Sequence, residues 1–481
     1  MSPDRLTQLI AHLLQKPERR WIEHKVDNSD PQRIGRYVSA LSNAAAADEE
    51  PFGYLLWGIE DGTKKIVGTQ FDPFSARKGN QSLEFWLAQQ SDPTPSIDFH
   101  AIDYEGVRLV LMQVGAASSA PIRFEGRAYI RIGDATPELA AQPDLEKQLW
   151  TVLQSYRWEE GMAAQFVTAQ EVTELLDYGS YFRLLGQPIP EHREQILQTL
   201  EADKLIQSDV GGRWNILNLG AILFAEELQT FDRIGRKAVR VIRYVGDTRV
   251  ETVRERTGAF GYAKAFEALI AVIDAQLPKR EKIGRALREV SSPFSELSIR
   301  ELVANALIHQ DMTIGGAGPM VEIFDNRVEI TNPGRPLVDP KRFIDYPPRS
   351  RNEAIASLMR RMNVCEERGS GIDKVVFEAE RSRLPPPDFA QLEGATRVTL
   401  YGPRPFSDMT PTERIRACYQ HATLKFLQGD RATNSTLRDR LGIEPGNAAQ
   451  VSRVFKQTSD SGLIKLADEA APRSGYVPWW A

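Results

Sequence analysis

The stretch RELVANALIHQDM, residues 300–312, combines the pattern of an apolar helix with Glu301 and Asn305, four residues apart. Side chains at this spacing share one helix face. Both offer oxygen atoms, which Mg²⁺ prefers when it binds together with substrate phosphates. We therefore expect Asn305 to ligate Mg²⁺ and Glu301 to orient or deprotonate a water. Ser298-x-x-Glu301 also matches a capping box, so a purely structural role for Glu301 stays open.

Two glycine-containing stretches follow further along the chain. TNPGRP, residues 331–336, closes a predicted strand, and ERGSGIDKV, residues 367–375, places Gly-x-Gly just before a predicted helix. Such glycines let backbone N–H groups approach a phosphate, and the helix dipole adds to the attraction. In this order, with the Glu301 helix first, the three stretches favour a nucleotide cradle.

A second group of candidate residues lies near the N-terminus. PERRWIEHK contains Glu18, Glu23 and Lys25, and WGIEDGT places Asp61 just after a predicted strand. Carboxylates at a strand end can hold a divalent metal against a phosphodiester, with the lysine supporting the phosphate. Acidic residues beside arginines also form ordinary solvated faces, and spacing alone leaves both interpretations open.

The elements that must position these residues divide into four predicted domains. Residues 1–140 form an α/β or α+β unit with a helix at YVSALSNAAAA and strands at GYLLWGI, VRLVLMQV and AYIRIG. Residues 141–235 are mostly helical and winged-helix-like, either a spacer or a DNA contact. Residues 236–405 predict a two-layer α/β sandwich: a strand at AVRVIRY, two long helical stretches, the Glu301 helix, and a hairpin turning at Asp325-Asn326.

Residues 406–481 predict a helix-turn-helix or winged-helix unit with helices in TNSTLRDRLGI and NAAQVSRVFKQTSDSGLIK. Segment 431–456 holds five Arg or Lys residues against two Asp or Glu residues, so it is mildly basic. The candidate nucleic-acid contacts there are Arg438, Arg440, Arg453 and Lys456. A role in dimerisation or packing is the alternative for this unit.

Composition narrows the class of protein. The chain has 481 residues, of which 42% are apolar and 26% charged, values ordinary for a soluble globular protein. Its net charge of -5 means that any basic surface must be local. Two distant cysteines exclude a disulfide framework and a thiolate zinc site. Neither a signal peptide nor a membrane span is expected, and a cytoplasmic location without membrane partners is the default.

Residues 236–405 resemble the divergent ATPase domains of the GHKL class, in ELVANALIHQD, EITNPG, RNEAIA and ERGSGI. The resemblance implies ATP and Mg²⁺ as cofactors, with Asn305 on the metal and Glu301 positioning the attacking water. Asn332 stands where the wider class has an adenine-reading Asp, and Gly334 lets the base approach. Because Asn332 carries no charge, ATP binding is favoured over fast hydrolysis. Contact with the phosphates is implied for Gly369, Ser370 and Gly371.

Residues 15–137 resemble the Schlafen AlbA-like domain, in WIEHK, YVSALSNA, GYLLWGIEDG and PIRFEGRAYIRIGDAT. The resemblance implies an endonuclease that uses Mg²⁺ or Mn²⁺, with Glu18, Glu23 and Asp61 as metal ligands. His24 replaces the aromatic residue that the family usually has. Arg127 and Arg131 match the closing strand, where arginines can hold a phosphate backbone.

Together the two resemblances predict an ATP-gated endonuclease that cuts structured RNA such as tRNA, or DNA, and that would fit phage defence. The alternative is a non-catalytic, ATP-sensing transcriptional regulator that binds DNA. A third hypothesis is an assembly protein in which ATP drives oligomerisation. A homo-oligomer is expected in each case.

Overall fold

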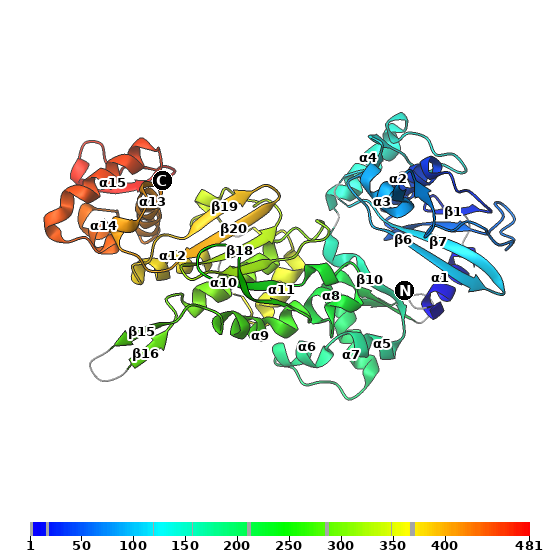
Figure 1. Ribbon diagram of the computed structural model, residues 1–481, viewed down its shortest axis with the longest axis horizontal. Helices are drawn as coiled ribbons and strands as arrows, with labels where there is room; N and C mark the ends of the chain where they lie inside the picture. The colour runs from blue at the N-terminus through cyan, green and yellow to red at the C-terminus, as the bar shows by residue number, and fades with distance from the viewer. Residues whose placement is uncertain are drawn as a thin grey trace. The chain divides into compact units, whose positions relative to one another are not determined.

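The computed structural model describes residues 3–15, 19–118, 120–155, 157–208, 213–283, 288–347, 349–365 and 371–481. Glu18, Gly369 and Ser370 lie outside these ranges. The chain forms two compact units (Figure 1), Met1–Val172 with Ile206–Asn218, and Thr173–Leu205 with Leu219–Ala481. Residues 141–235 therefore contribute to both units. The architecture is mixed α/β with several sheets, as predicted.

The first unit is built on a four-stranded sheet with the order β1-β2-β7-β6. Its strands are β1 (Ile22–Lys25), β2 (Phe52–Trp57), β6 (Ile97–Tyr104) and β7 (Val107–Gly115). The strands β1 and β2 are parallel, and the other neighbours are antiparallel. Because β1 runs beside β2, its last residues reach the loop that follows β2, which is where the predicted N-terminal site would form.

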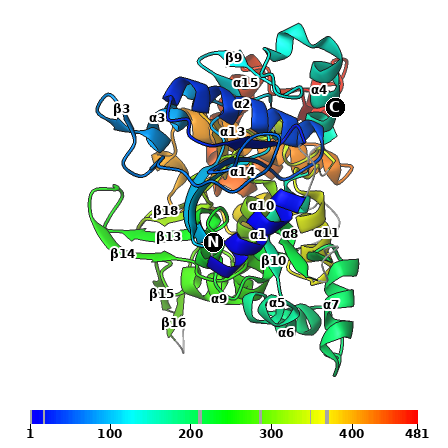
Figure 2. The same cartoon turned by 90° about the vertical axis from the view of Figure 1, so that its right-hand side faces the viewer.

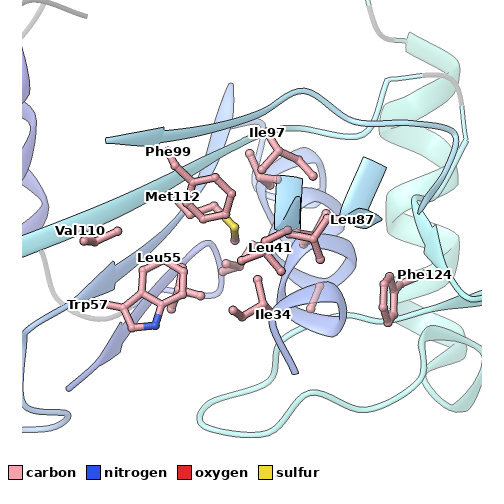
Figure 3. Close-up of a cluster of buried hydrophobic side chains, with 14 of the residues drawn as sticks. Ile34, Leu41, Leu55, Trp57, Leu87, Ile97, Phe99, Val110, Met112 and Phe124 are labelled. Atoms are coloured by element: carbon pink, nitrogen blue, oxygen red, sulfur yellow. The ribbon is translucent and has the colours of Figure 1, made fainter. Parts of the chain in front are cut away.

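Helix α2 (Pro31–Ala47) packs against this sheet, and Asp30 caps it by accepting a hydrogen bond from the Gln32 N–H. The close approach depends on Gly53, because a Cβ there would lie 2.6 Å from the Leu41 carbonyl oxygen. The core between them contains Leu41, Leu55 and Trp57 (Figure 3). The strand predicted at AYIRIG is wrong in extent, since β9 covers only Arg127–Ala128 and isolated bridges follow.

The remaining elements of the first unit are short. They are α1 (Pro3–Gln15), β3 (Arg77–Lys78), β4 (Gln81–Ser82), α3 (Leu83–Gln90), β5 (Ser91–Asp92), β8 (Arg123–Phe124), α4 (Pro143–Ser155), β10 (Met162–Val167), β11 (Ile206–Ser208) and β12 (Trp214–Leu217). The last three pair as an antiparallel sheet with the order β10-β12-β11.

The second unit is built on a six-stranded sheet with the order β14-β13-β17-β18-β20-β19. Its strands are β13 (Arg240–Tyr244), β14 (Thr252–Thr257), β17 (Met320–Ile323), β18 (Arg327–Pro333), β19 (Asp388–Leu392) and β20 (Ala395–Tyr401). The predicted hairpin at Asp325-Asn326 is confirmed, since β17 and β18 pair antiparallel around it. The register of β18 on β20 sets Asn332 opposite Thr396.

Helices α9 (Tyr262–Asp274), α10 (Glu296–His309) and α12 (Gly371–Arg381) form the second layer. Helix α10 contacts both α12 and β18. The prediction of two long helices before α10 is wrong. Among the described residues between β14 and α10, only α9 is helical. Strand β15 (Arg280–Ile283) pairs with β16 (Arg288–Ser291) as a ribbon that projects from the unit (Figures 1 and 2).

The second unit also contains the helices near its first segment, α6 (Tyr178–Leu184), α7 (Arg193–Ala202) and α8 (Asn218–Phe224), with α5 (Ala169–Leu175) crossing the boundary and α11 (Glu353–Arg361) later in the chain. Its C-terminal part consists of α13 (Pro411–Leu427), α14 (Asn434–Leu441), α15 (Ala448–Asp460), β21 (Ile464–Leu466) and β22 (Tyr476–Pro478). A capping box between Thr410 and Glu413 starts α13. Along the described ranges, we find no helix with the length and apolarity to cross a bilayer.

Candidate functional site

The cavity beside α10 brings together most of the residues predicted for the nucleotide. It has a volume of about 260 Å³, and Glu301, Asn305, Asn332 and Gly371 all line it. The capping-box reading of Glu301 is wrong, because α10 begins at Glu296 with Ser295 as its cap. Glu301 therefore stands within the helix and faces the cavity, one turn before Asn305.

Gly371, the first residue of α12, lies against Glu301. A Cβ on Gly371 would meet the Glu301 Oε2 atom at 2.4 Å and the Asn305 Nδ2 atom at 3.9 Å. No side chain fits there without displacing the carboxylate. The N-terminus of α12, which is the positive end of the helix dipole, thus opens on the same space as Glu301 and Asn305 of α10.

On the sheet side of the cavity, Asn332 and Thr396 are partners on adjacent strands. The Asn332 side chain is buried, and its NH₂ group donates to the Pro333 carbonyl at 3.3 Å. This orients the amide and leaves its Oδ1 atom as an acceptor. Sequence reasoning missed Thr396, because only the strand register places it beside Asn332.

Gly334 has a different role from the one predicted. It does not line the cavity, and it has a positive φ of 101°. A Cβ there would lie 2.6 Å from the Cβ of Asp311. Glycine is required at this position because the backbone is left-handed and Asp311 packs on it.

The structure explains the Arg351-Asn352 pair, whose role the sequence does not reveal. The Asn352 Nδ2 atom donates to the carbonyls of Ile308, at 2.7 Å, and Gln310, at 2.9 Å. Arg351 forms an ion pair with Asp311. The pair therefore satisfies the carbonyls at the end of α10 and fixes the residues that follow it, which holds the helix that carries Glu301 and Asn305.

The cavity is also lined by three residues that sequence reasoning missed. Arg349 and Arg360 bring positive charge, and both are exposed. Cys365 lies there too, and burial raises the pKa of its thiol to about 11, so it stays protonated at neutral pH. Arg349 and Arg360 flank the RNEAIA motif, but no sequence spacing assigns them to this cavity.

The residues of this cavity fit a magnesium-nucleotide. Apolar side chains such as Leu302 and Ile330 cover much of its wall, and a few polar groups converge on it, which is the usual composition of a cofactor site. Asn305 and Glu301 supply the hard oxygen donors that Mg²⁺ takes. The two arginines and the start of α12 suit phosphates, while Asn332 and Thr396 suit the edge of a base.

The N-terminal candidates also converge, but as a closed charge cluster. The Lys25 Nζ atom lies 2.5 Å from Glu23 Oε1 and 2.8 Å from Asp61 Oδ2. The other oxygen of Glu23 pairs with Arg131. Glu23 and Arg131 are buried, with side chains 2% and 3% exposed, and Asp61 is 43% exposed.

Burial dominates the electrostatics of this cluster. It raises the pKa of Glu23 although Arg131 and Lys25 oppose the shift. It lowers the pKa of the neighbouring His24 to about 4. Burial also disfavours the charge on Lys25, but its hydrogen bonds to Asp61 and Glu23 outweigh this and raise its pKa. Lys25 is therefore a fixed cation between two carboxylates.

This arrangement does not fit a divalent metal. The Lys25 ammonium holds the position between Glu23 and Asp61 that a metal ion would need, and both Glu23 oxygens face cations. Within the described ranges no group of three His, Cys, Asp or Glu side chains is placed to ligate a metal. The third predicted ligand, Glu18, lies outside those ranges.

The arginines predicted at this site occupy different environments. Arg131, whose guanidinium also donates to the Gly133 carbonyl at 2.8 Å, is a buried partner of Glu23 rather than an exposed phosphate contact. It lines a hollow of about 270 Å³ together with Arg19 and Arg20. Arg127 is 67% exposed and pairs with Glu138 at 2.7 Å, which raises the pKa of the guanidinium.

The four basic residues predicted in the C-terminal part are also divided. Arg453 and Lys456 are exposed on α15, and Arg438 is half-buried on α14. Arg440 is buried, and its Nη2 atom donates to the Leu384 carbonyl at 2.7 Å. Arg440 therefore ties α14 to the end of α12, and its orientation could not be predicted from sequence.

Two family models match this chain, one in each of the two compact units. The family model described as "Schlafen, AlbA_2" matches residues 18–140, and the model described as "Putative ATP-dependent DNA helicase recG C-terminal" matches residues 316–400. The two matches confirm the predicted order of a Schlafen AlbA-like part before an ATPase-like part. None of the curated proteins is similar enough to this chain to be counted as a relative.

Solved structures give weaker likenesses. A crystal structure of a Corynebacterium diphtheriae protein is 16% identical, covers 98% of this chain and 96% of its own, and has a TM-score of 0.42. The solution structure of the N-terminal domain of a RecG-related protein from Nitrosomonas europaea is 24% identical. It covers 27% of this chain and 89% of that domain, with a TM-score of 0.19.

Proposed function

We propose that this protein acts on nucleic acid and that ATP, bound with Mg²⁺ in the cavity beside α10, gates that action. The proposal rests on one observation: Glu301, Asn305, Asn332 and Gly371 come from three separate elements and line the same cavity. The match to an ATP-dependent helicase C-terminal model and the match to a Schlafen model support the two halves of the proposal.

The polar groups of the cavity divide the parts of ATP among them. The Asn332 Oδ1 atom accepts a hydrogen bond from the adenine amino group, beside Thr396 on the neighbouring strand. Backbone N–H groups at the start of α12 hold the phosphates. Asn305 is the protein ligand of Mg²⁺, and the bound ion would neutralise charge on the phosphate oxygens. Glu301 orients a water, although the uncharged Asn332 favours binding over rapid turnover.

The gating route runs along α12. Its first residue, Gly371, faces the cavity, whereas Glu380 near its other end contacts the C-terminal helices. The His421 Nδ1 atom of α13 lies 3.2 Å from both Glu380 carboxylate oxygens. A shift of α12 on nucleotide binding would therefore reposition α13 and α14, which is a physical coupling between two sites.

Calorimetry on the full chain tests this function. ATP with Mg²⁺ should bind, and Asn305→Ala should weaken that binding about tenfold or more while the melting temperature holds. Binding of a labelled RNA or DNA should then change on addition of ATP. Absence of ATP binding at millimolar nucleotide contradicts the proposal.

A second candidate activity is cleavage of RNA, such as tRNA, or DNA by the first unit, which would fit phage defence. What favours it is the match of residues 18–140 to the Schlafen model, together with the hollow lined by Arg19 and Arg20. In the structure the Lys25 ammonium, rather than a metal ion, stands between Glu23 and Asp61. The test is incubation of the full chain with tRNA and duplex DNA, with and without Mg²⁺, Mn²⁺ and ATP. Cleavage that Asp61→Asn abolishes supports it.

Intact substrates under every condition, together with specific promoter binding, would favour the ATP-sensing regulator instead. A change in oligomeric size with nucleotide, without nucleic-acid binding, would favour the assembly protein.

A further inference from the structure

We infer that a groove between the ATPase-like part and the C-terminal helices binds a nucleic-acid strand through its phosphates. The groove has a volume of about 880 Å³. Five arginines line it, from α12 to α15, and the only carboxylate among its described lining residues is Glu444. On a chain with a net charge of -5, this is a strong local excess of positive charge. The inference rests on the proposed action on nucleic acid and names the site.

Two of the arginines are available to a ligand. Arg383, in the turn after α12, and Arg453, on α15, are both exposed. Neither guanidinium forms a hydrogen bond or an ion pair with a residue that the structure describes. The Arg383 guanidinium lies near the turn after α14, since its Nη1 atom would be 3.7 Å from a Cβ on Gly442. Arginines from two parts of the unit thus share one groove.

A third arginine is buried and incompletely satisfied. Arg440 has one hydrogen bond, to the Leu384 carbonyl, and its Nε atom has no hydrogen-bond partner and lies 3.6 Å from Glu380. Burial lowers the pKa of this guanidinium, although its ion pair with Glu380 opposes the shift. A phosphate in the groove would add a second negative charge beside it.

The other features of the groove suit a strand. Asn447, which precedes α15, makes no side-chain cap bond and lines the groove, so the first N–H groups of this helix lie beside it. These groups and the helix dipole attract phosphate. Apolar side chains, including Phe406 and Ile443, line the groove between the charges. Charges that hold a backbone, alternating with apolar surface for sugars and bases, are typical of strand binding without sequence readout.

Two further arginines of the groove, one before α13 and one on it, are held by bonds within the protein. Arg414 donates to the carbonyls of Phe406 and Ser407, both at 3.0 Å, and its guanidinium lies 4.3 Å from the centre of the Phe406 ring. Arg404 pairs with Glu413. These bonds fix one wall, whereas Arg383 and Arg453 keep their donors for the ligand.

The test is fluorescence anisotropy of labelled 20-nucleotide single strands and duplexes with the full chain, over a range of salt concentrations. The double variant Arg383→Gln/Arg453→Gln should bind at least tenfold more weakly. It should also reduce the slope of log affinity against log salt by about 1.4 for single strands, since each phosphate contact contributes about 0.7. Arg431→Gln/Arg473→Gln, which removes two exposed arginines of the same C-terminal part outside the groove, is the matched control.

The possible results distinguish failure of the groove proposal from failure of the proposed function. If the wild type binds and the double variant binds equally well, nucleic acid is held elsewhere and the groove is wrong while the proposed function stands. Equal losses in the groove variant and in Arg431→Gln/Arg473→Gln also contradict the groove, because the effect is then one of total charge. If the wild type binds no RNA or DNA, with or without ATP, both the inference and the proposed function fail. Matching melting temperatures exclude misfolding.

Discussion

The two candidate sites use similar residue types in opposite ways. At the N-terminal cluster, Glu23 and Asp61 are neutralised by Lys25 and Arg131, so the charges satisfy one another. At the cavity beside α10, Glu301 and Asn305 face an open volume of about 260 Å³. Convergence of polar groups therefore indicates a ligand only where space and unneutralised donors remain beside them.

The largest effect that sharpens this comparison is loss of the buried carboxylate. Glu23→Ala should lower the free energy of unfolding of the first unit by about 3–5 kcal/mol, because Arg131 is left as an uncompensated buried charge. Glu301→Ala, at the open cavity, should change stability far less. Hydrogen exchange of peptides from β1 and β2 in the full chain measures the first effect. Equal protection in wild type and Glu23→Ala would mean that the cluster is not a structural ion-pair network.

The second prediction concerns pH at the same cluster. The folded pKa of His24 is about 4, below its ordinary 6.5, so the neutral ring contributes stability above pH 6.5 that is lost as the pH falls toward 4. The loss is roughly 3 kcal/mol at most, since one pKa unit corresponds to about 1.4 kcal/mol. The raised pKa of Glu23 has the opposite sign and offsets part of the loss.

His24→Phe is the matched variant, because it keeps an aromatic ring and cannot titrate. The protection of β1 amides against hydrogen exchange, corrected for the intrinsic pH dependence of exchange, should fall between pH 6.5 and 4 in the wild type. It should stay nearly constant in His24→Phe. A profile that is the same in both proteins assigns the pH dependence to other groups.

The part of each site that residue spacing alone could predict is the part held on one element. Glu301 and Asn305 share α10, so helical spacing alone places them together, and Glu23 and Lys25 share β1. The motifs also placed Asn332 and Gly371 at the cavity of α10, and Asp61 near Lys25. Contacts that no motif marks were missed. The pairing of Thr396 with Asn332 follows from strand register, and the burial of Arg131 and Arg440 follows from partners far along the chain.

The third prediction concerns a side chain added inside the cavity beside α10. Gly371→Val should reduce ATP affinity at least tenfold, because even a Cβ there would meet the Glu301 carboxylate at 2.4 Å. Gly315→Val is the control, since Gly315 has no neighbouring atom within 4 Å and no positive φ. Isothermal titration calorimetry with Mg-ATP measures both variants. Unchanged affinity in Gly371→Val would mean that the start of α12 is not part of the binding site.

The smallest predicted effect is on the preference for ATP over GTP. If the Asn332 Oδ1 atom accepts from the adenine amino group, Asn332→Ala should lower ATP affinity about five- to tenfold, which is the loss of roughly one hydrogen bond. GTP carries a carbonyl at the corresponding position, so its weaker binding should hardly change, and the preference for ATP should shrink by the same factor. Thr396→Val tests the neighbouring strand in the same way. Equal losses for ATP and GTP would indicate that Asn332 shapes the cavity wall without reading the base, and the comparison with the closed cluster would then rest on α10 and α12 alone.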